Sequence, residues 1–141
     1  MDEKDKQIIE LLRENARMPF TKIADEIGVT ESTIRKRVKS LEKRGVIEGY
    51  TAEVDPGKMG YGTTAIVGLD VESEYLLKAV EDLKKVEEVK SISTSTGDHM
   101  IMMEVWAKDN SHLSEVVFNK IGGVKGVKDL CPAIVLEEIK T

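Results

Sequence analysis

The side chains best suited to chemistry in this 141-residue chain are hydroxyls and cations that lie between Thr30 and Lys43. Within this stretch Ile34, Val38 and Leu41 recur at intervals of four and three, which predicts a helix with one buried stripe. The opposite face then carries Ser32, Lys36, Lys39, Ser40 and Lys43. Such a face can donate hydrogen bonds to base edges and phosphates, so it fits the major groove of DNA.

A second helix and a tight turn are predicted to position this face. Ile23, Ala24 and Ile27 recur at helical spacing, and Gly28 supplies the permissive backbone of a sharp turn. Thr30 then suits the N-cap of the basic helix, because its hydroxyl can accept from free backbone amides. The plainer alternative is a solvated amphipathic helix; the turn, the cap and the preceding helix favour DNA binding over it.

A first helix and an extended segment flank this pair. Residues 2–15 begin with Asp2 as a plausible cap and carry Ile8, Leu11 and Leu12 on one side, which predicts a helix that ends before Pro19. After Gly45, residues 46–54 alternate as extended chain does, which predicts a short strand or wing followed by a turn at residues 55–57. The three helices should form a bundle too small to be very stable alone.

Length and charge divide the chain into two parts. Its size fits one ordinary domain or two small ones. The net charge of −5 consists of +1 up to Tyr50, where all five arginines lie, and −6 from Thr51 onward, so the halves have different electrostatic roles. Without a long apolar run or a signal peptide, we expect a cytoplasmic protein that does not enter a membrane. Cys131 is the only cysteine, which excludes an intrachain disulfide and a thiolate-based metal site made by one chain and leaves an intermolecular disulfide as the alternative. We expect no metal site and no cofactor.

The second part has the pattern of a βαββαβ, ferredoxin-like α+β domain. A strand from Thr63 alternates through Val71, a helix follows with inward residues, and residues 89–96 and 99–107 should form a hairpin around Gly97 and Asp98. A second helix and a final strand, residues 127–139, complete the set, with Pro132 indicating a sheet edge. The inward residues of the two helices are predicted to be Leu76, Leu77, Val80 and Leu83, and Leu113, Val116, Val117 and Ile121.

One face of this sheet is predicted to be uncovered by helices. It would carry Ile66, Met100, Met102 and Trp106, which are too apolar to remain in water. We therefore expect a dimer formed through the sheets; the alternative is a monomer with an apolar face.

Residues 23–50 (IADEIGVTESTIRKRVKSLEKRGVIEGY), together with STGDHMIM and GVKDLCPAIVLEEIK farther on, resemble the Lrp/AsnC family of transcriptional regulators, most of all its archaeal members. The resemblance implies a winged helix-turn-helix DNA-binding domain in residues 1–50, a wing and linker in residues 51–62, and a RAM (effector-binding and oligomerisation) domain in residues 63–141. It also implies sequence-specific binding of pseudo-palindromic, double-stranded promoter DNA by homodimers that assemble into tetramers or octamers.

Within that frame the DNA-binding residues divide by position on the helix. Ser32, Thr33 and Lys36 lie nearest its N-terminus and should meet base edges. Phosphate contacts are expected from Arg35, Lys39, Ser40 and Lys43, with Arg17 and Lys22 as outlying helpers. Arg37 lies beside the apolar stripe, so pairing with Asp25 or Glu26 is an equal alternative to a phosphate contact.

The resemblance also implies that a small effector, often an amino acid, binds between dimers beside the hairpin turn. The residues concerned are Thr96, Gly97, Asp98, His99 and Met100. Met100 stands where many amino-acid-responsive members have Asp or Asn, and a thioether accepts poorly from an ammonium group. The effector is therefore either absent or unusual. Gly97 and Asp98 would equally suit an ordinary hairpin turn with no role in binding.

Two other functions fit the sequence less well than DNA binding. A haem-precursor decarboxylase, as some relatives are, needs cations for many carboxylates and usually a histidine, yet no arginine follows Arg44 and only His99 and His112 are present. No nucleophile–base pair, paired carboxylates or phosphate loop stands out, so we expect no enzyme. A small-molecule sensor without DNA binding conflicts with the basic helix.

Overall fold

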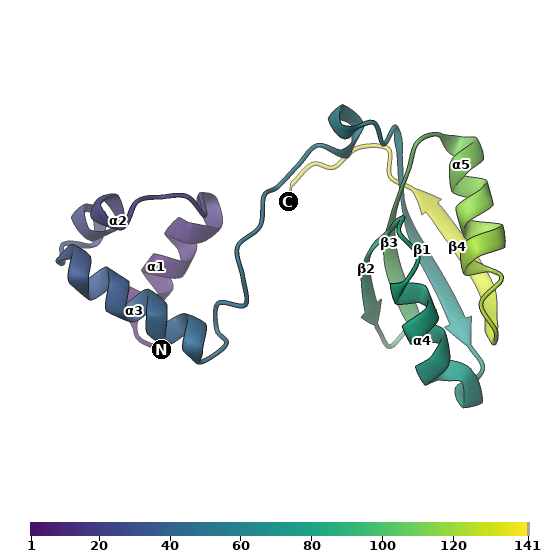
Figure 1. Cartoon of the computed structure of the whole chain (residues 1–141), viewed down its shortest axis with the longest axis horizontal. Helices are drawn as coiled ribbons and strands as arrows, with labels where there is room; N and C mark the ends of the chain where they lie inside the picture. Colours follow the sequence, from purple (N-terminus) through teal and green to yellow (C-terminus); the bar gives the residue numbers. More distant parts are fainter. Residues whose placement is uncertain (141) are drawn as a thin grey trace. The chain divides into compact units, whose positions relative to one another are not determined.

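The computed structural model describes residues 1–140, which form two compact units, Met1–Val54 and the chain from Asp55 onward (Figure 1). The first unit has three helices, α1 (Glu3–Glu14), α2 (Phe20–Ile27) and α3 (Glu31–Lys43). Ile34 and Leu41 of α3 are fully buried and Val38 is nearly so, which confirms the predicted stripe. They pack with Ile8 of α1 and other apolar residues of α1 and α2.

Local capping explains where these helices begin. The Asp2 carboxylate accepts a hydrogen bond from the Asp5 amide at 2.9 Å, and Thr30 Oγ1 accepts one from the Thr33 amide at 3.3 Å. Each bond satisfies an amide that the first turn leaves free, as predicted. Gly28 has φ +82°, a left-handed conformation in which glycine is favoured, and it turns the chain between α2 and α3.

The predicted wing is not present as a strand. Residues 46–54 have no regular secondary structure, and no strand within residues 1–140 pairs with them. An extended segment forms a strand only when a neighbouring strand takes up its backbone hydrogen bonds, and this chain supplies none there. Val46, Tyr50 and Val54 are about half exposed, and the Tyr50 hydroxyl donates to Glu42 Oε2 at 3.0 Å.

The second unit is the predicted βαββαβ arrangement. Its elements are β1 (Thr63–Val71), α4 (Leu76–Lys84), β2 (Val89–Thr94), β3 (Ile101–Ala107), α5 (Asn110–Glu115) continued by the π-helical turn η3 (Val116–Ile121), and β4 (Val127–Ile134). The strands form an antiparallel sheet in the order β2-β3-β1-β4, and the helices cover one face (Figure 1). Pro132 lies on edge strand β4, as predicted, although β4 ends at Ile134 rather than Ile139. Residues 95–100 form the β2–β3 loop, so both hairpin strands are shorter than predicted.

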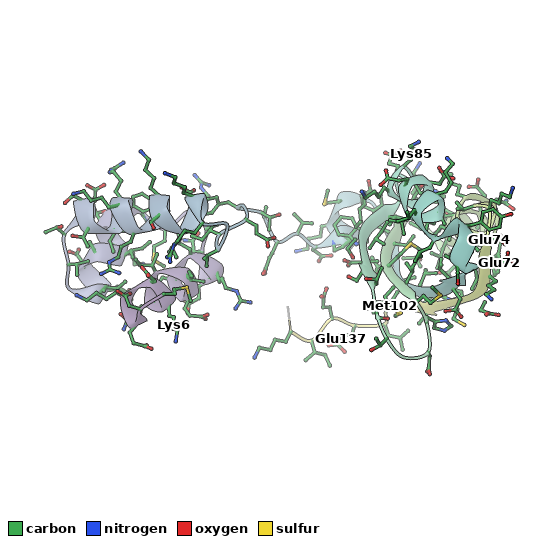
Figure 2. The ribbon with its side chains drawn as sticks, turned by 90° about the horizontal axis from the view of Figure 1, so that it is seen from below. Lys6, Glu72, Glu74, Lys85, Met102 and Glu137 are labelled. Carbon is green, nitrogen blue, oxygen red and sulfur yellow. The ribbon has the colours of Figure 1, made fainter. Side chains whose placement is uncertain are left out.

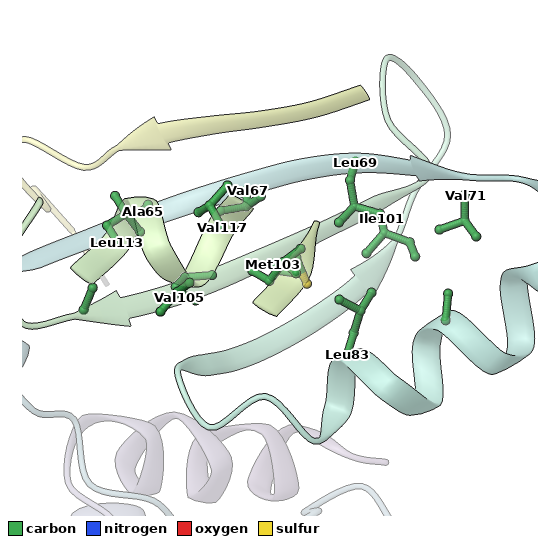
Figure 3. Packing of buried hydrophobic residues seen from close by; sticks show 14 residues of the cluster. Ala65, Val67, Leu69, Val71, Leu83, Ile101, Met103, Val105, Leu113 and Val117 are labelled. Atoms are coloured by element: carbon green, nitrogen blue, oxygen red, sulfur yellow. The ribbon is translucent and has the colours of Figure 1, made fainter. Parts of the chain in front are cut away.

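The core of this unit lies between the sheet and its helices (Figure 3). Val67 and Leu69 of β1 and Leu83 of α4 are fully buried, as predicted. Leu77 was predicted to face inward but is 85% exposed, and Ala79 takes the buried position. Leu76, Ala79, Val80 and Leu83 follow one another at helical spacing and face the sheet, whereas Leu77 lies about 100° around the helix from Leu76. No helix within residues 1–140 is long and apolar enough to cross a bilayer.

The other face of the sheet carries Ile66, which is 46% exposed, and the partly buried Met102 and Trp106. In Figure 2 Met102 and Lys85, which follows α4, lie on opposite sides of the sheet. Met100 is an exception to the prediction, because its side chain packs against the core cluster. This open face, defined by Ile66, Met102 and Trp106, also includes polar residues such as Glu104.

Candidate nucleic-acid interface

Hydroxyl groups gather where α3 begins. Thr30 Oγ1 lies 2.8 Å from Thr33 Oγ1 and 3.1 Å from Ser32 Oγ, so the capping residue connects the two hydroxyls predicted to meet bases. Ser32 is exposed, whereas Thr33 is half-buried. Ser32 is therefore the more accessible of the two for a base edge.

The outward face of α3 presents a row of cations. Lys36, Lys39 and Lys43 are exposed together with Ser40, and none of these lysines forms an ion pair with any residue from 1 to 140. An ammonium group that is exposed to water loses little free energy by having no ion-pair partner. It can replace a counterion when it binds the phosphate backbone of DNA. The predicted face is thus accessible and not neutralised by its own chain.

Arg35 is more constrained than its neighbours. Its guanidinium pairs with Glu31 one turn earlier and lies 5.7 Å from the centroid of the Phe20 ring. The side chain remains 65% exposed. These contacts hold Arg35 beside the N-terminal turn of α3. A phosphate there could replace the Glu31 carboxylate as the partner of its guanidinium.

Arg37 has a structural role, and its predicted partners were wrong. Its Nη1 atom lies 2.8 Å from Asp2 Oδ2 and 3.0 Å from Asp5 Oδ1, rather than near Asp25 or Glu26. The backbone hydrogen bond from Asp5 and the guanidinium of Arg37 lower the pKa of Asp2 from 3.8 to about 2. Arg37 therefore joins α3 to the start of α1.

The ion pairs of Arg37 with Asp2 and Asp5, which we call the clamp, predict that the folded state becomes less stable in acid. The lowered pKa of Asp2 means that its stabilisation is complete above about pH 4 and is lost as the pH falls toward 2. Arg37→Gln should therefore lower the melting temperature at pH 7 and flatten its decline between about pH 4 and pH 2. Arg35→Gln, which removes a cation from the same helix, is the control and should keep that decline. Thermal unfolding followed by circular dichroism measures both; an unchanged acid profile in Arg37→Gln would contradict the clamp.

The two outlying cations lie outside α3. Arg17 is exposed between α1 and α2, and Lys22 is exposed on α2. Neither forms an ion pair with a residue of the described chain. Both therefore remain available for phosphates, and both belong to the same compact unit as the cation row.

The five residues predicted to bind an effector lie together at the β2–β3 loop. Gly97 has φ +123°, Thr96 and Asp98 are exposed, and His99 and Met100 are partly buried. The Met100 amide donates to Asp70 Oδ1 at 2.9 Å. Asp70 was not predicted to lie at this loop, because the sequence marks it only through the alternation of β1, as a charged residue near the end of the strand.

His112, the other histidine, is engaged internally. Its Nδ1 atom accepts from the Lys108 amide at 3.0 Å, and its Nε2 atom lies 3.4 Å from Glu88 Oε2. Lys120 Nζ lies 2.8 Å from the same oxygen. Burial raises the pKa of Glu88, but the hydrogen bonds and charge of Lys120 outweigh it and hold that pKa below its usual value. The cluster is a satisfied ion-pair network that joins Glu88, in the turn before β2, to α5 and η3.

Comparison with known proteins agrees with this geometry. Residues 1–42 match an AsnC-type helix-turn-helix domain, and residues 64–141 match a Lrp/AsnC ligand binding domain. The chain is 48% identical to the HTH-type transcriptional regulator LrpA of Pyrococcus horikoshii over 99% of both chains. It is 36% identical to LrpA1 of Halobacterium salinarum over 96% of both.

A solved structure gives the same architecture. Escherichia coli AsnC superposes with a TM-score of 0.87 at 28% identity, which covers 100% of this chain and 97% of that one. The two family domains occur here in one chain, with the helix-turn-helix first, as the sequence predicts. The chain therefore belongs to the Lrp/AsnC family of helix-turn-helix transcriptional regulators, whose members matched here are DNA-binding regulators and not enzymes.

Proposed function

We propose that the chain is a cytoplasmic regulator that binds pseudo-palindromic promoter DNA as a dimer, with α3 in the major groove. The main support for DNA binding by α3 is its row of exposed lysines, which form no ion pair within residues 1–140: Lys36, Lys39 and Lys43. Arg37 is tied to α1 and does not join the row. In this proposal residues 1–50 bind DNA, residues 51–62 link, and residues 63–141 bind effector and oligomerise.

Position along α3 assigns the individual contacts. Ser32, Thr33 and Lys36 at the N-terminal end read base edges, because that end of a recognition helix enters the groove most deeply. Lys39, Ser40 and Lys43 meet phosphates, as does Arg35 after it leaves Glu31. Arg17 and Lys22 add contacts to the flanking backbone.

In this proposal, dimerisation of two chains explains why the recognised DNA sequence is pseudo-palindromic. The open face of the sheet, with Ile66, Met102 and Trp106, is the surface through which two copies join. A two-fold dimer then places its two α3 helices about 34–36 Å apart, in successive major grooves. Tetramers or octamers would extend the same arrangement along DNA.

Effector binding is assigned to the β2–β3 loop. Asp98 is exposed there and can accept from a ligand ammonium group, whereas the Met100 side chain packs against the core and its amide is already bonded. The ligand class is an amino acid or a similar small cation-bearing molecule, bound between dimers. It shifts DNA binding through the assembly.

A charge-removal experiment tests DNA binding directly. The variant Lys36→Ala/Lys39→Ala/Lys43→Ala should weaken operator binding by roughly 100-fold or more, because it removes the base contact of Lys36 and the phosphate contacts of Lys39 and Lys43. The control variant Lys78→Ala/Lys84→Ala/Lys85→Ala removes three exposed lysines in and beside α4, and should bind as the wild type does. Fluorescence anisotropy with labelled duplex measures both. Equal losses in the two variants would refute the assignment of the interface to α3.

A further inference from the structure

The His99 ring packs directly against strand β1. A Cβ atom added to Gly68 would lie 2.6 Å from His99 Cδ2 and 3.0 Å from Cγ, closer than van der Waals contact allows. Only glycine at position 68 leaves room for the imidazole. The His99 ring therefore packs into the space that Gly68 leaves open on β1, and its side chain is only 21% exposed.

One nitrogen of this ring lacks the partner that burial demands. His99 Nδ1 is buried and has no hydrogen-bond partner within the described chain, while Asp70 Oδ2 lies 3.7 Å away. An unprotonated Nδ1 would direct its lone pair toward a carboxylate, which is unfavourable. A proton on Nδ1 lets the ring donate to that carboxylate, and protonation of both ring nitrogens adds the attraction between imidazolium and carboxylate.

The same carboxylate also holds the backbone of the loop. Asp70 Oδ1 accepts from the Met100 amide at 2.9 Å. Inside the loop the Ser95 amide donates to the Met100 carbonyl at 2.9 Å, and Ser95 Oγ donates to the His99 carbonyl at 2.7 Å. Asp70 is therefore shared between the His99 ring and the backbone of residues 95–100.

Three other charged groups, Asp129, Lys128 and Asp98, lie around Asp70 and His99. The Met100 amide, the charge of His99 and a hydrogen bond shared with Asp129 lower the pKa of Asp70. Asp129 lies at the bulge of β4, with φ +53°, and Lys128 lies opposite Asp70 in the sheet. Asp98 is exposed in the loop itself. Carboxyl groups normally titrate well below pH 5.5 and lysine well above pH 8, whereas histidine titrates between them.

We propose that His99 and Asp70 are positioning residues of the β2–β3 loop, and that a proton on His99 tightens the loop in the conformation that an effector meets. The regulatory meaning rests on the effector function proposed above. The latch, defined as the contact of His99 with Asp70, stabilises the loop when the imidazole is doubly protonated and loosens when the ring is neutral.

Hydrogen exchange of the Met100 and Ser95 amides tests the latch in the full-length chain, without DNA or effector. After correction for intrinsic exchange rates, their protection should be about two- to fivefold greater at pH 5.5 than at pH 8, as a partly exposed ion pair permits. His99→Gln should remove this difference. Asp70→Asn should also remove it while keeping an acceptor for the Met100 amide, and His112→Gln should retain it.

A second variant guards against an indirect effect of changing the histidine. Gly68→Ala displaces the ring and leaves every titratable group in place, so it too should flatten the pH dependence. Protection that does not change with pH in the wild type, or that changes equally in His99→Gln, would overturn the proposal. Failure of the effector function would show separately, as DNA binding that no amino acid alters while the exchange result stands.

Discussion

Met102→Asp should abolish tight operator binding, by roughly 100-fold or more, although Met102 is not among the residues assigned to DNA. Met102 lies on β3 in register with Gly68 of β1 and Ser93 of β2, within the open face of the sheet. In a two-fold interface the change would bury two unpaired carboxylates, which costs several kcal/mol. The dimer would dissociate, and a single helix-turn-helix unit would lose the high effective concentration that its partner gives it.

Sedimentation velocity and operator titration together test this prediction. Leu77→Asp is the matched control, because Leu77 is 85% exposed on α4, the helix-covered side of the same sheet. It should leave both the dimer and operator binding intact. An intact dimer in Met102→Asp would show that the copies join through another surface.

Lys36→Ala should weaken specific DNA more than random DNA, by about 1–3 kcal/mol, because it removes a contact to a base edge. Lys43→Ala, two turns farther along α3, should weaken both kinds of DNA similarly and reduce the salt slope by about one unit. Both lysines are exposed and form no ion pair within residues 1–140, so the expected difference between them arises from their positions along the helix.

Titrations of operator and random duplex at several salt concentrations separate the two roles. Lys78→Ala, an exposed lysine paired with Asp82 on α4, supplies the control for loss of one positive charge. An equal loss on every sequence for Lys36→Ala would exclude it from base reading. A greater loss on the operator for Lys43→Ala would reverse the assignment of the two ends of the helix.

Local patterns were enough to predict most of the fold. The buried stripe of α3, the caps at Asp2 and Thr30, and the alternation of β1 depend on spacings of a few residues, and all are observed. Leu77 was misplaced because it is apolar, although it lies about 100° around the helix from Leu76 and thus off the stripe of Leu76, Val80 and Leu83. The wing was misjudged because a strand requires a partner, and spacing alone cannot supply one.

The partners of Arg37 and the role of Asp70 were not predicted, because both depend on contacts between residues far apart in the sequence. Arg37 pairs with Asp2 and Asp5, which lie 35 and 32 residues away, whereas the sequence suggested acids of the adjacent helix. Asp70 bonds to the amide of Met100, 30 residues later, so its role depends on the pairing of β1 with β3. The outward face of α3, by contrast, follows from helical geometry once its buried stripe is known.

Selection of bound sequences from a random DNA pool tests the proposed mode of DNA binding most directly. The wild-type chain should enrich a pseudo-palindrome whose half-sites are centred about one helical turn, or 10–10.5 base pairs, apart. Such spacing is required if two α3 helices related by a two-fold axis enter successive major grooves. Enrichment of a single site without symmetry, or no enrichment over the starting pool, would contradict dimeric reading of DNA by α3.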